Sequence, residues 1–138
     1  MEKTHKLWPL FSNAFNIENL TGISLRYVNK FNLPLDTKHL TEYFTTYLKD
    51  DKNTHSIYGF QLKYNSFDRE NNFNIYIGHA LEKPIENSIP YLIDIDVIYN
   101  SNIENNAEII WPIFEKIRTR KNLIFNNSLT DQAKSLIN

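Results

Sequence analysis

Asp94 and Asp96 are the residues whose type and spacing come closest to catalytic chemistry in this sequence. They lie two positions apart in the segment 91–99 (YLIDIDVIY), which alternates as a β-strand does. On one face of a strand the two acids would stand about 7 Å apart, two rises of roughly 3.3 Å each. Paired carboxylates can hold a Mg²⁺ or Mn²⁺ ion that also neutralises phosphate oxygens. One hypothesis is therefore a metal-dependent enzyme that acts on nucleotides or nucleic acid.

The same two acids also fit a structural role. Arg26 and Lys63 fall on the same predicted sheet face, where a cation on one strand pairs with an acid on another. No third carboxylate is evident near Asp94 and Asp96, and Glu82 is the nearest candidate in the sequence. Ion-pair networks also imitate functional clusters. The sequence thus favours salt bridges among these residues and leaves metal binding as the alternative.

Arg26 also has an alternative role in binding a ligand. A guanidinium group can hold an anionic ligand with two parallel hydrogen bonds, which a lysine does not do equally well. For Arg26 and Lys63, contact with a ligand or partner is therefore the alternative to pairing with the acids.

Three basic residues, Arg118, Arg120 and Lys121, cluster near the end of a predicted helix. Such a cluster can contact nucleic acid or another partner. More often, positive charges at a helix C-terminus offset the helix dipole and face solvent. Because the formal net charge is -1 and acids are mixed among the bases, the chain offers no general attraction for nucleic acid or an anionic membrane. We expect neither as a partner.

Other catalytic and cofactor chemistries find little support. The histidines at positions 5, 39, 55 and 79 lack the spacing of a metal motif. His79 alternates with core residues, which predicts a hydrogen-bonded histidine at the end of a strand. The chain has no cysteine, and its glycines at 22, 59 and 78 are too far apart for a phosphate-binding loop. We therefore expect no cofactor.

Length and composition indicate one folded domain over residues 1–138. Apolar residues make up 41% of the chain, charged residues 22% and aromatic residues 14%. These shares are ordinary for a globular protein and argue against disorder. The lack of cysteine, of an apolar signal segment after Met1 and of any long apolar run favours the cytoplasm.

Four segments alternate with the period of a strand, and each has apolar or aromatic side chains on one face. The predicted strands are Gly22–Phe31, Tyr58–Tyr64, Phe73–Leu81 and Tyr91–Tyr99. A turn cluster at 65–72 predicts a hairpin between the second and third strands, and prolines at 84 and 90 preclude a long helix before the fourth. The last three strands should therefore form an antiparallel meander.

Helical spacing marks other segments. In Asp36–Leu48, apolar residues recur at positions 40, 43, 44, 47 and 48, which predicts an amphipathic helix. Ala107–Ile124 predicts a long helix with acids early and bases late, in which Pro112 lies in the first turns or forms a kink. Residues 7–15 predict a short helix or docked arm with Pro9 near the helix start. Residues 128–131 offer caps for a short terminal helix that ends at 136–137.

These elements predict an α+β fold in two layers, a mostly antiparallel sheet of about four strands with helices packed on one face. The opposite face would carry the polar residues of the strands, and it is polar enough to be solvated. They are Arg26, Lys30, Gln61, Lys63, Tyr76, Asp94 and Asp96.

Three motifs resemble those of an uncharacterised, sporadically distributed prokaryotic family. Residues 22–30 (GISLRYVNK) and 121–133 (KNLIFNNSLTDQA) follow its patterns G-x-x-L-R-Y-[IV]-N and K-N-x-x-F-x-x-S-[IL]-T-D-x-A. Between them, in the same order and spacing, residues 92–97 (LIDIDV) are similar to its L-D-I-D pattern, with isoleucine at position 93 in place of leucine. The chain resembles the C-terminal half of the family's members. The resemblance implies a shared fold, a sheet that another piece of chain completes in longer members, and a loose association with patchily inherited gene clusters such as those of defence.

These observations favour a non-catalytic protein-interaction module. We expect an open sheet face or edge to recruit a protein partner or a second copy of the chain. The alternative is a metal-dependent nucleotide or nucleic-acid enzyme that uses Asp94 and Asp96.

Overall fold

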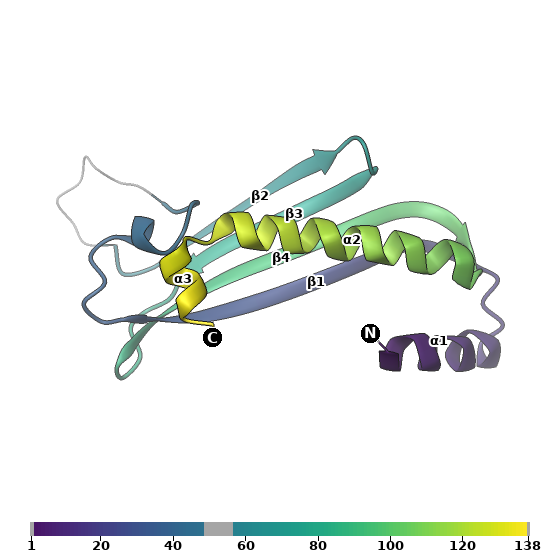
Figure 1. Cartoon of the computed structure of the whole chain (residues 1–138), viewed down its shortest axis with the longest axis horizontal. Coiled ribbons are helices and arrows are strands. Elements are labelled where there is room, and N and C mark those ends of the chain that lie inside the picture. Colours follow the sequence, from purple (N-terminus) through teal and green to yellow (C-terminus); the bar gives the residue numbers. More distant parts are fainter. Residues whose placement is uncertain (1, 49–56, 138) are drawn as a thin grey trace.

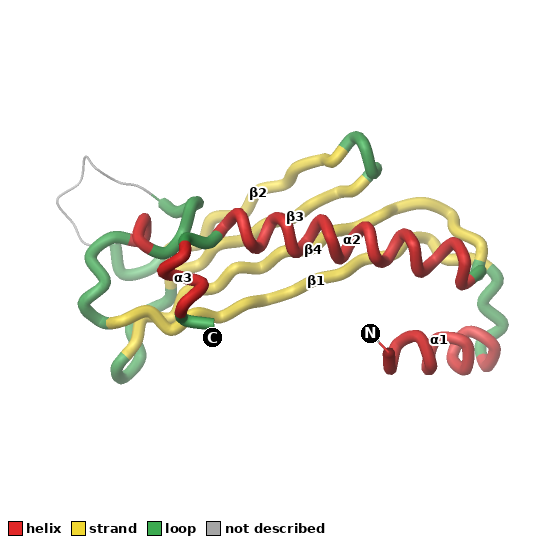
Figure 2. Tube along the Cα trace, viewed as in Figure 1, coloured by secondary structure: helices red, strands yellow, loops and turns green. Residues whose placement is uncertain are grey.

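The computed structural model describes residues 2–48 and 57–137 and has the predicted α+β fold. One antiparallel sheet has the strand order β1-β4-β3-β2, and helices α2 and α3 lie on one of its faces (Figure 1; Figure 2). His55 lies outside the described residues. The elements in chain order are α1 (Glu2–Ala14), β1 (Asn19–Pro34), the 3-10 helix η1 (Leu40–Glu42), β2 (Phe60–Asp68), β3 (Phe73–Leu81), β4 (Ser88–Glu104), α2 (Ala107–Ser128) and α3 (Asp131–Ser135).

All four predicted strands are present, and β2, β3 and β4 form the predicted antiparallel meander. β3 has the predicted bounds, whereas β1 and β4 extend beyond theirs because they pair with each other along almost their whole length. β2 begins two residues later than predicted and continues to Asp68, so the first half of the predicted turn cluster at 65–72 is strand. Pro34 ends β1 on the edge of the sheet, where a residue without an N–H group is tolerated.

The apolar face of β4 lies in the core, as the alternation of its residues predicts. Tyr91, Ile93, Ile95 and Val97 are fully buried. Helix α2 crosses this face and adds the fully buried Ile117 to the same cluster. The predicted long helix is thus confirmed, although it continues past its expected end to Ser128.

The predicted helix over Asp36–Leu48 is wrong. Only the short η1 turn forms there, and Phe44 instead makes an isolated β-bridge with Leu129. Four threonines in this segment disfavour a helix because branching at Cβ restricts their side chains there. Tyr43 and Phe44 are still buried, so the apolar pattern reflects core packing in an irregular segment.

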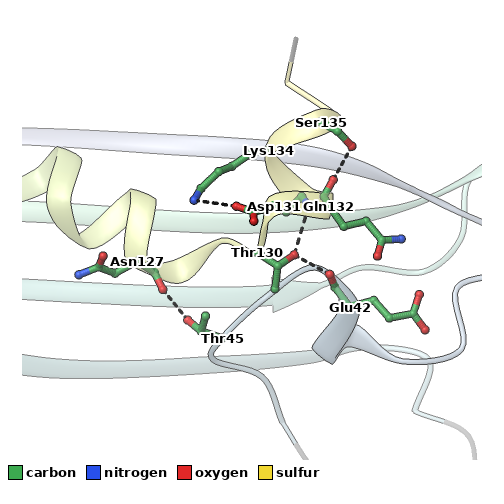
Figure 3. Close-up of polar contacts among 9 residues, drawn as sticks. Glu42, Thr45, Asn127, Thr130, Asp131, Gln132, Lys134 and Ser135 are labelled. Atoms are coloured by element: carbon green, nitrogen blue, oxygen red, sulfur yellow. Dashed lines mark hydrogen bonds and ion pairs between the residues drawn. The ribbon is translucent and has the colours of Figure 1, made fainter.

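The irregular segment is tied to the junction between α2 and α3. Thr45 donates its hydroxyl to the carbonyl of Asn127 at 2.8 Å (Figure 3). The backbone N–H of Thr130 donates to the carbonyl of Tyr43 at 2.9 Å. The Thr130 hydroxyl accepts from Ala133 N–H, which confirms the predicted cap of the terminal helix, and donates to the carbonyl of Glu42. These bonds replace the hydrogen bonds that a helix would have made.

Helix α1 packs at the end of the sheet where β1 begins and β4 ends (Figure 1). Trp8 donates its indole N–H to the Asn105 side chain at 3.0 Å, and His5 stacks on Trp111 with ring centroids 3.7 Å apart. The expected position of Pro9 near the helix start is wrong, because the helix begins at Glu2 and Pro9 lies inside it. Within the described residues, no helix is long and apolar enough to cross a membrane.

Candidate functional site

The strand register gathers the predicted polar residues on the sheet face opposite α2. Arg26 on β1 lies directly across from Asp96 on β4, which in turn lies across from Tyr76 on β3. One row along, Gly78 on β3 stands between Asp94 on β4 and Lys63 on β2. Because α2 and α3 both pack on the other side, we call this the uncovered face, a term limited to the described part of the chain (Figure 1).

A hollow of about 260 Å³ opens in the uncovered face at Gly78. A Cβ atom on Gly78 would lie 3.5 Å from the Cβ of Asp94 and 3.8 Å from the Cγ of Lys63, so the missing side chain leaves this space. The residues that line the hollow are Arg26, Lys63, Tyr64, Asn65, Tyr76, Ile77, Gly78, Asp94 and Asp96.

Arg26 and Asp94 form a two-pronged ion pair on one side of the hollow. The Arg26 Nε donates to Asp94 Oδ1 at 2.9 Å, and Nη2 donates to Oδ2 at 2.6 Å. The hydrogen bond from Arg26 holds the pKa of Asp94 below its usual value, although burial opposes that shift. The same bond raises the pKa of Arg26. The pair is partly solvated, with 62% of the Arg26 side chain and 32% of the Asp94 side chain exposed. One of the expected salt bridges is therefore present.

Asp96 differs from Asp94 in having no such partner. Its Oδ1 atom is buried and has no hydrogen-bond donor among the residues that the structure describes. Burial raises the pKa of Asp96, the positive charge of Arg26 opposes this shift, and the negative charge of Asp94 adds to it. The Oδ1 atom of Asp96 is thus a buried hydrogen-bond acceptor to which no described residue donates.

The geometry gives little support for a metal centre at the two acids. Both oxygens of Asp94 accept from Arg26, so this carboxylate would have to break the ion pair before it could bind a metal. Across the described ranges 2–48 and 57–137, no group of three or more His, Cys, Asp or Glu residues could hold a metal ion. A metal would therefore have to be held by two acids that are differently engaged.

The three predicted basic residues of α2 do not join this site. Arg118 bonds to Glu115 at 3.1 Å, and Arg120 Nε lies 3.1 Å from a carboxylate oxygen of Asp68. Lys121 is buried, with its Nζ 3.5 Å from the centre of the Tyr27 ring. Burial lowers the pKa of Lys121. The expected position at a helix C-terminus is also wrong, because α2 continues to Ser128 and has no basic residue in its last turn.

His79 has the structural role that its place in the strand predicts. It is 1% exposed, and its Nδ1 lies 3.1 Å from the hydroxyl of Tyr91. Because that hydroxyl donates to the Thr46 carbonyl, His79 Nδ1 is the donor to Tyr91. Burial lowers the pKa of His79, so the ring is held neutral in the core.

Sequence reasoning places Tyr76 on this sheet face, but it does not single out Gly78 as part of a site. An isolated glycine inside a strand pattern is a signal for a bulge or a close approach, and Gly78 carries that signal. Comparison of the chain with protein-family models, curated proteins and solved structures found no match.

Proposed function

We propose that this protein is a non-catalytic protein-interaction module that binds a polypeptide partner at the hollow in its uncovered sheet face. The observation that carries the proposal is the glycine at the centre of this face. A glycine inside a strand weakens the strand, and it usually marks a bulge, a tight bend or a close approach by a ligand or another backbone.

The first two explanations do not fit Gly78. The pairings of β3 with β2 and with β4 run in register without a bulge, and no described glycine has a positive φ angle. A Cβ atom at Gly78 would meet only ordinary van der Waals contacts. Neither the backbone nor the packing requires glycine here, which leaves the close approach of a binding partner.

Gly22 shows what a structurally required glycine looks like in the same sheet. A Cβ atom there would lie 2.8 Å from the backbone oxygen of Tyr99, at the position where the β1–β4 register shifts. This close backbone contact explains Gly22 without any partner. The contrast between the two glycines supports a functional reason for Gly78.

The dimensions and surroundings of the hollow favour a polypeptide over a small metabolite. Its volume of about 260 Å³ is below the ~300–1,000 Å³ of typical small-molecule pockets and suits one inserted side chain. Tyr76, Val28 and Phe67 are exposed on the same face and add apolar and aromatic surface around it. Aromatic residues are enriched at protein interfaces.

The biological setting of this module is part of the proposal. The resemblance of the three motifs to a sporadically distributed prokaryotic family supports an accessory protein of a patchily inherited gene cluster, such as one for defence. Either another protein or a second copy of the chain would supply the inserted side chain. Size-exclusion chromatography with light scattering separates these two cases.

A peptide selection with two matched variants tests the proposal. Peptides are selected from a random display library on the wild-type chain and then measured on Gly78→Val and Ala80→Val. Ala80 lies on the same strand and face but outside the hollow, so Ala80→Val controls for a general effect on β3. We expect the selected peptides to bind Ala80→Val and to lose binding to Gly78→Val. Peptides that bind both variants equally, or a selection with no enrichment, would contradict the proposal.

A further inference from the structure

We infer that the side chain inserted into the hollow is a basic one, an arginine or lysine of the partner, and that Asp96 receives its charge. This inference rests on the proposed function, and it names the chemistry of the partner. It follows from the charges and hydrogen-bonding groups that the strands place around Gly78.

The unmatched group of the hollow is an acceptor. Within the described chain, the buried Oδ1 of Asp96 has no donor, and buried polar groups of folded proteins are nearly always hydrogen-bonded. Asp96 also lines the hollow, so a donor that enters the hollow can reach its carboxylate group. The group that completes the site is therefore a hydrogen-bond donor.

The formal charges that line the hollow sum to zero, with two bases and two acids, so it is the unpaired carboxylate of Asp96 that favours a cation over a neutral or anionic donor. Arg26 already gives two N–H groups to Asp94, so these opposite charges offset each other. Among the described residues, the charge of Asp96 is left without a hydrogen-bonded counter-ion. Burial raises the pKa of Asp96, and the nearby charge of Arg26 only partly opposes this shift. A guanidinium or ammonium group would supply both the donor and the positive charge.

Tyr76 provides a second reason for a basic side chain. It lies directly across from Asp96 on the next strand, and its ring is partly exposed beside the hollow. A cation that pairs with Asp96 would therefore lie close to an aromatic ring, and such rings attract Lys and Arg. A planar guanidinium can also stack on the ring, which favours arginine.

Lys63 limits how much positive charge the site accepts. It lines the hollow on the other side of Gly78, and its charge acts on Asp94. A second cation next to the inserted one would meet Lys63, whereas an acidic neighbour would be attracted to it. The expected recognition element is thus a single basic residue with a neutral or acidic neighbour.

An NMR titration with three small probes tests the inference. The probes are blocked single amino acids, N-acetyl-N′-methylamides of arginine, of its uncharged analogue citrulline, and of glutamate. We expect the arginine probe to shift the backbone amide signals of Tyr76, Gly78 and Asp96 in a saturable way. Citrulline should bind roughly tenfold more weakly or worse, since it lacks the positive charge that strengthens a hydrogen bond to the Asp96 carboxylate. Glutamate should not compete.

The variant Asp96→Asn should weaken the arginine probe by roughly tenfold or more. Asp131→Asn is the matched control, because it removes an exposed carboxylate on α3. The spectrum of each variant shows whether the fold is kept. Equal binding of arginine and citrulline, preferential binding of glutamate, or an Asp96→Asn variant that binds arginine normally would overturn the inference.

The peptide selection separates this failure from failure of the proposed function. Peptides that contain no basic residue but lose binding to Gly78→Val would support the interaction module and overturn only the inference of a basic side chain. Peptides that bind Gly78→Val as well as the wild type would overturn the proposed interaction module itself.

Discussion

Arg26 lies directly across the β1–β4 ladder from Asp96, yet it gives its two bonded N–H groups to Asp94 in the next row. The diagonal pairing satisfies Asp94 and leaves the buried Oδ1 of Asp96 without a donor in the described part of the chain. Two acids that look equivalent in the sequence therefore have pKa values shifted in opposite directions. Our proposal makes Asp94 part of the scaffold and Asp96 a binding residue.

Replacing each acid by asparagine should affect the free energy of unfolding differently. Asp94→Asn should lower the free energy of unfolding at neutral pH because Arg26 loses its partner. Asp96→Asn should leave it unchanged or raise it, because an ionised carboxylate without a donor is removed. Urea unfolding of both variants at neutral pH measures the two effects.

The pH dependence of these two variants should also differ. The pKa of Asp94 is lowered in the folded state, so its contribution is present above about pH 4 and is lost as the pH falls below that value. The pKa of Asp96 is raised, so the wild type should gain stability relative to Asp96→Asn as the pH falls toward 4. A strong loss of stability in Asp96→Asn at neutral pH would show that this acid is part of the scaffold.

The two glycines of the sheet should respond oppositely to alanine. Gly78→Ala should raise the free energy of unfolding by about 0.5–1 kcal/mol, because alanine restricts the unfolded chain and fits the available space. Gly22→Ala should lower it by about 1–3 kcal/mol, because its Cβ would collide with the backbone oxygen of Tyr99. Chemical unfolding compares both with the wild type. A destabilised Gly78→Ala would mean that the glycine has a structural cause.

Stability should fall in mildly acidic solution because of His79. Its pKa is lowered by burial, so below about pH 6.5 the unfolded chain takes up a proton that the folded chain resists. The free energy of unfolding should be level above this value and decrease as the pH falls toward the folded pKa, by up to about 1.4 kcal/mol per pH unit. His79→Phe should remove this slope, and His39→Gln, at an exposed position, should retain it. If the pH dependence of the free energy of unfolding persists in His79→Phe, another titrating group causes it.

Phe44 should anchor the irregular segment despite the absence of the predicted helix. It is 1% exposed and stacks on Tyr91 with ring centroids 3.8 Å apart. Phe44→Ala should therefore lower the free energy of unfolding by about 3–5 kcal/mol. Leu48, which the helix would also have buried, is 43% exposed, so Leu48→Ala should have a much smaller effect. Comparable losses in both variants would argue that a helix forms in solution.

Mg²⁺ and Mn²⁺ should leave the melting temperature of the protein unchanged. A ligand that binds only the folded state must raise its stability, and Asp94 is already engaged by Arg26. A thermal-shift titration checks this. A clear rise with either metal that disappears in Asp96→Asn would instead support the enzyme hypothesis.

The strands could be predicted because the alternation of apolar and polar residues that marks a strand lies within a short segment of the sequence. Alternating residues must face opposite sides of a strand, so Phe73–Leu81 and the buried side of β4 follow directly from the sequence. The spacing in Asp36–Leu48 predicts a helix that does not form, since its backbone finds hydrogen-bond partners near Thr130, far away in the chain. Partners at that separation cannot be inferred from periodicity.

The candidate site could be predicted only in part. The face that collects Arg26, Lys63, Asp94 and Asp96 follows from the period of the strands. Whether Arg26 pairs with Asp94 or with Asp96 depends on the register between strands that lie far apart in the sequence. A binding role for Gly78 can be inferred only when its neighbours on both adjacent strands are known.

The central claim is that the hollow at Gly78 faces solvent in the native protein and is where a partner binds. Because the chain has no cysteine, a single cysteine at Gly78 or at Ile75 reports one face of β3 through its rate of alkylation. We expect Gly78→Cys to react readily and Ile75→Cys, on the buried face and outside the hollow, to react slowly, and a selected peptide to protect only the former. A Gly78→Cys variant that reacts as slowly as Ile75→Cys in dilute solution would contradict the account.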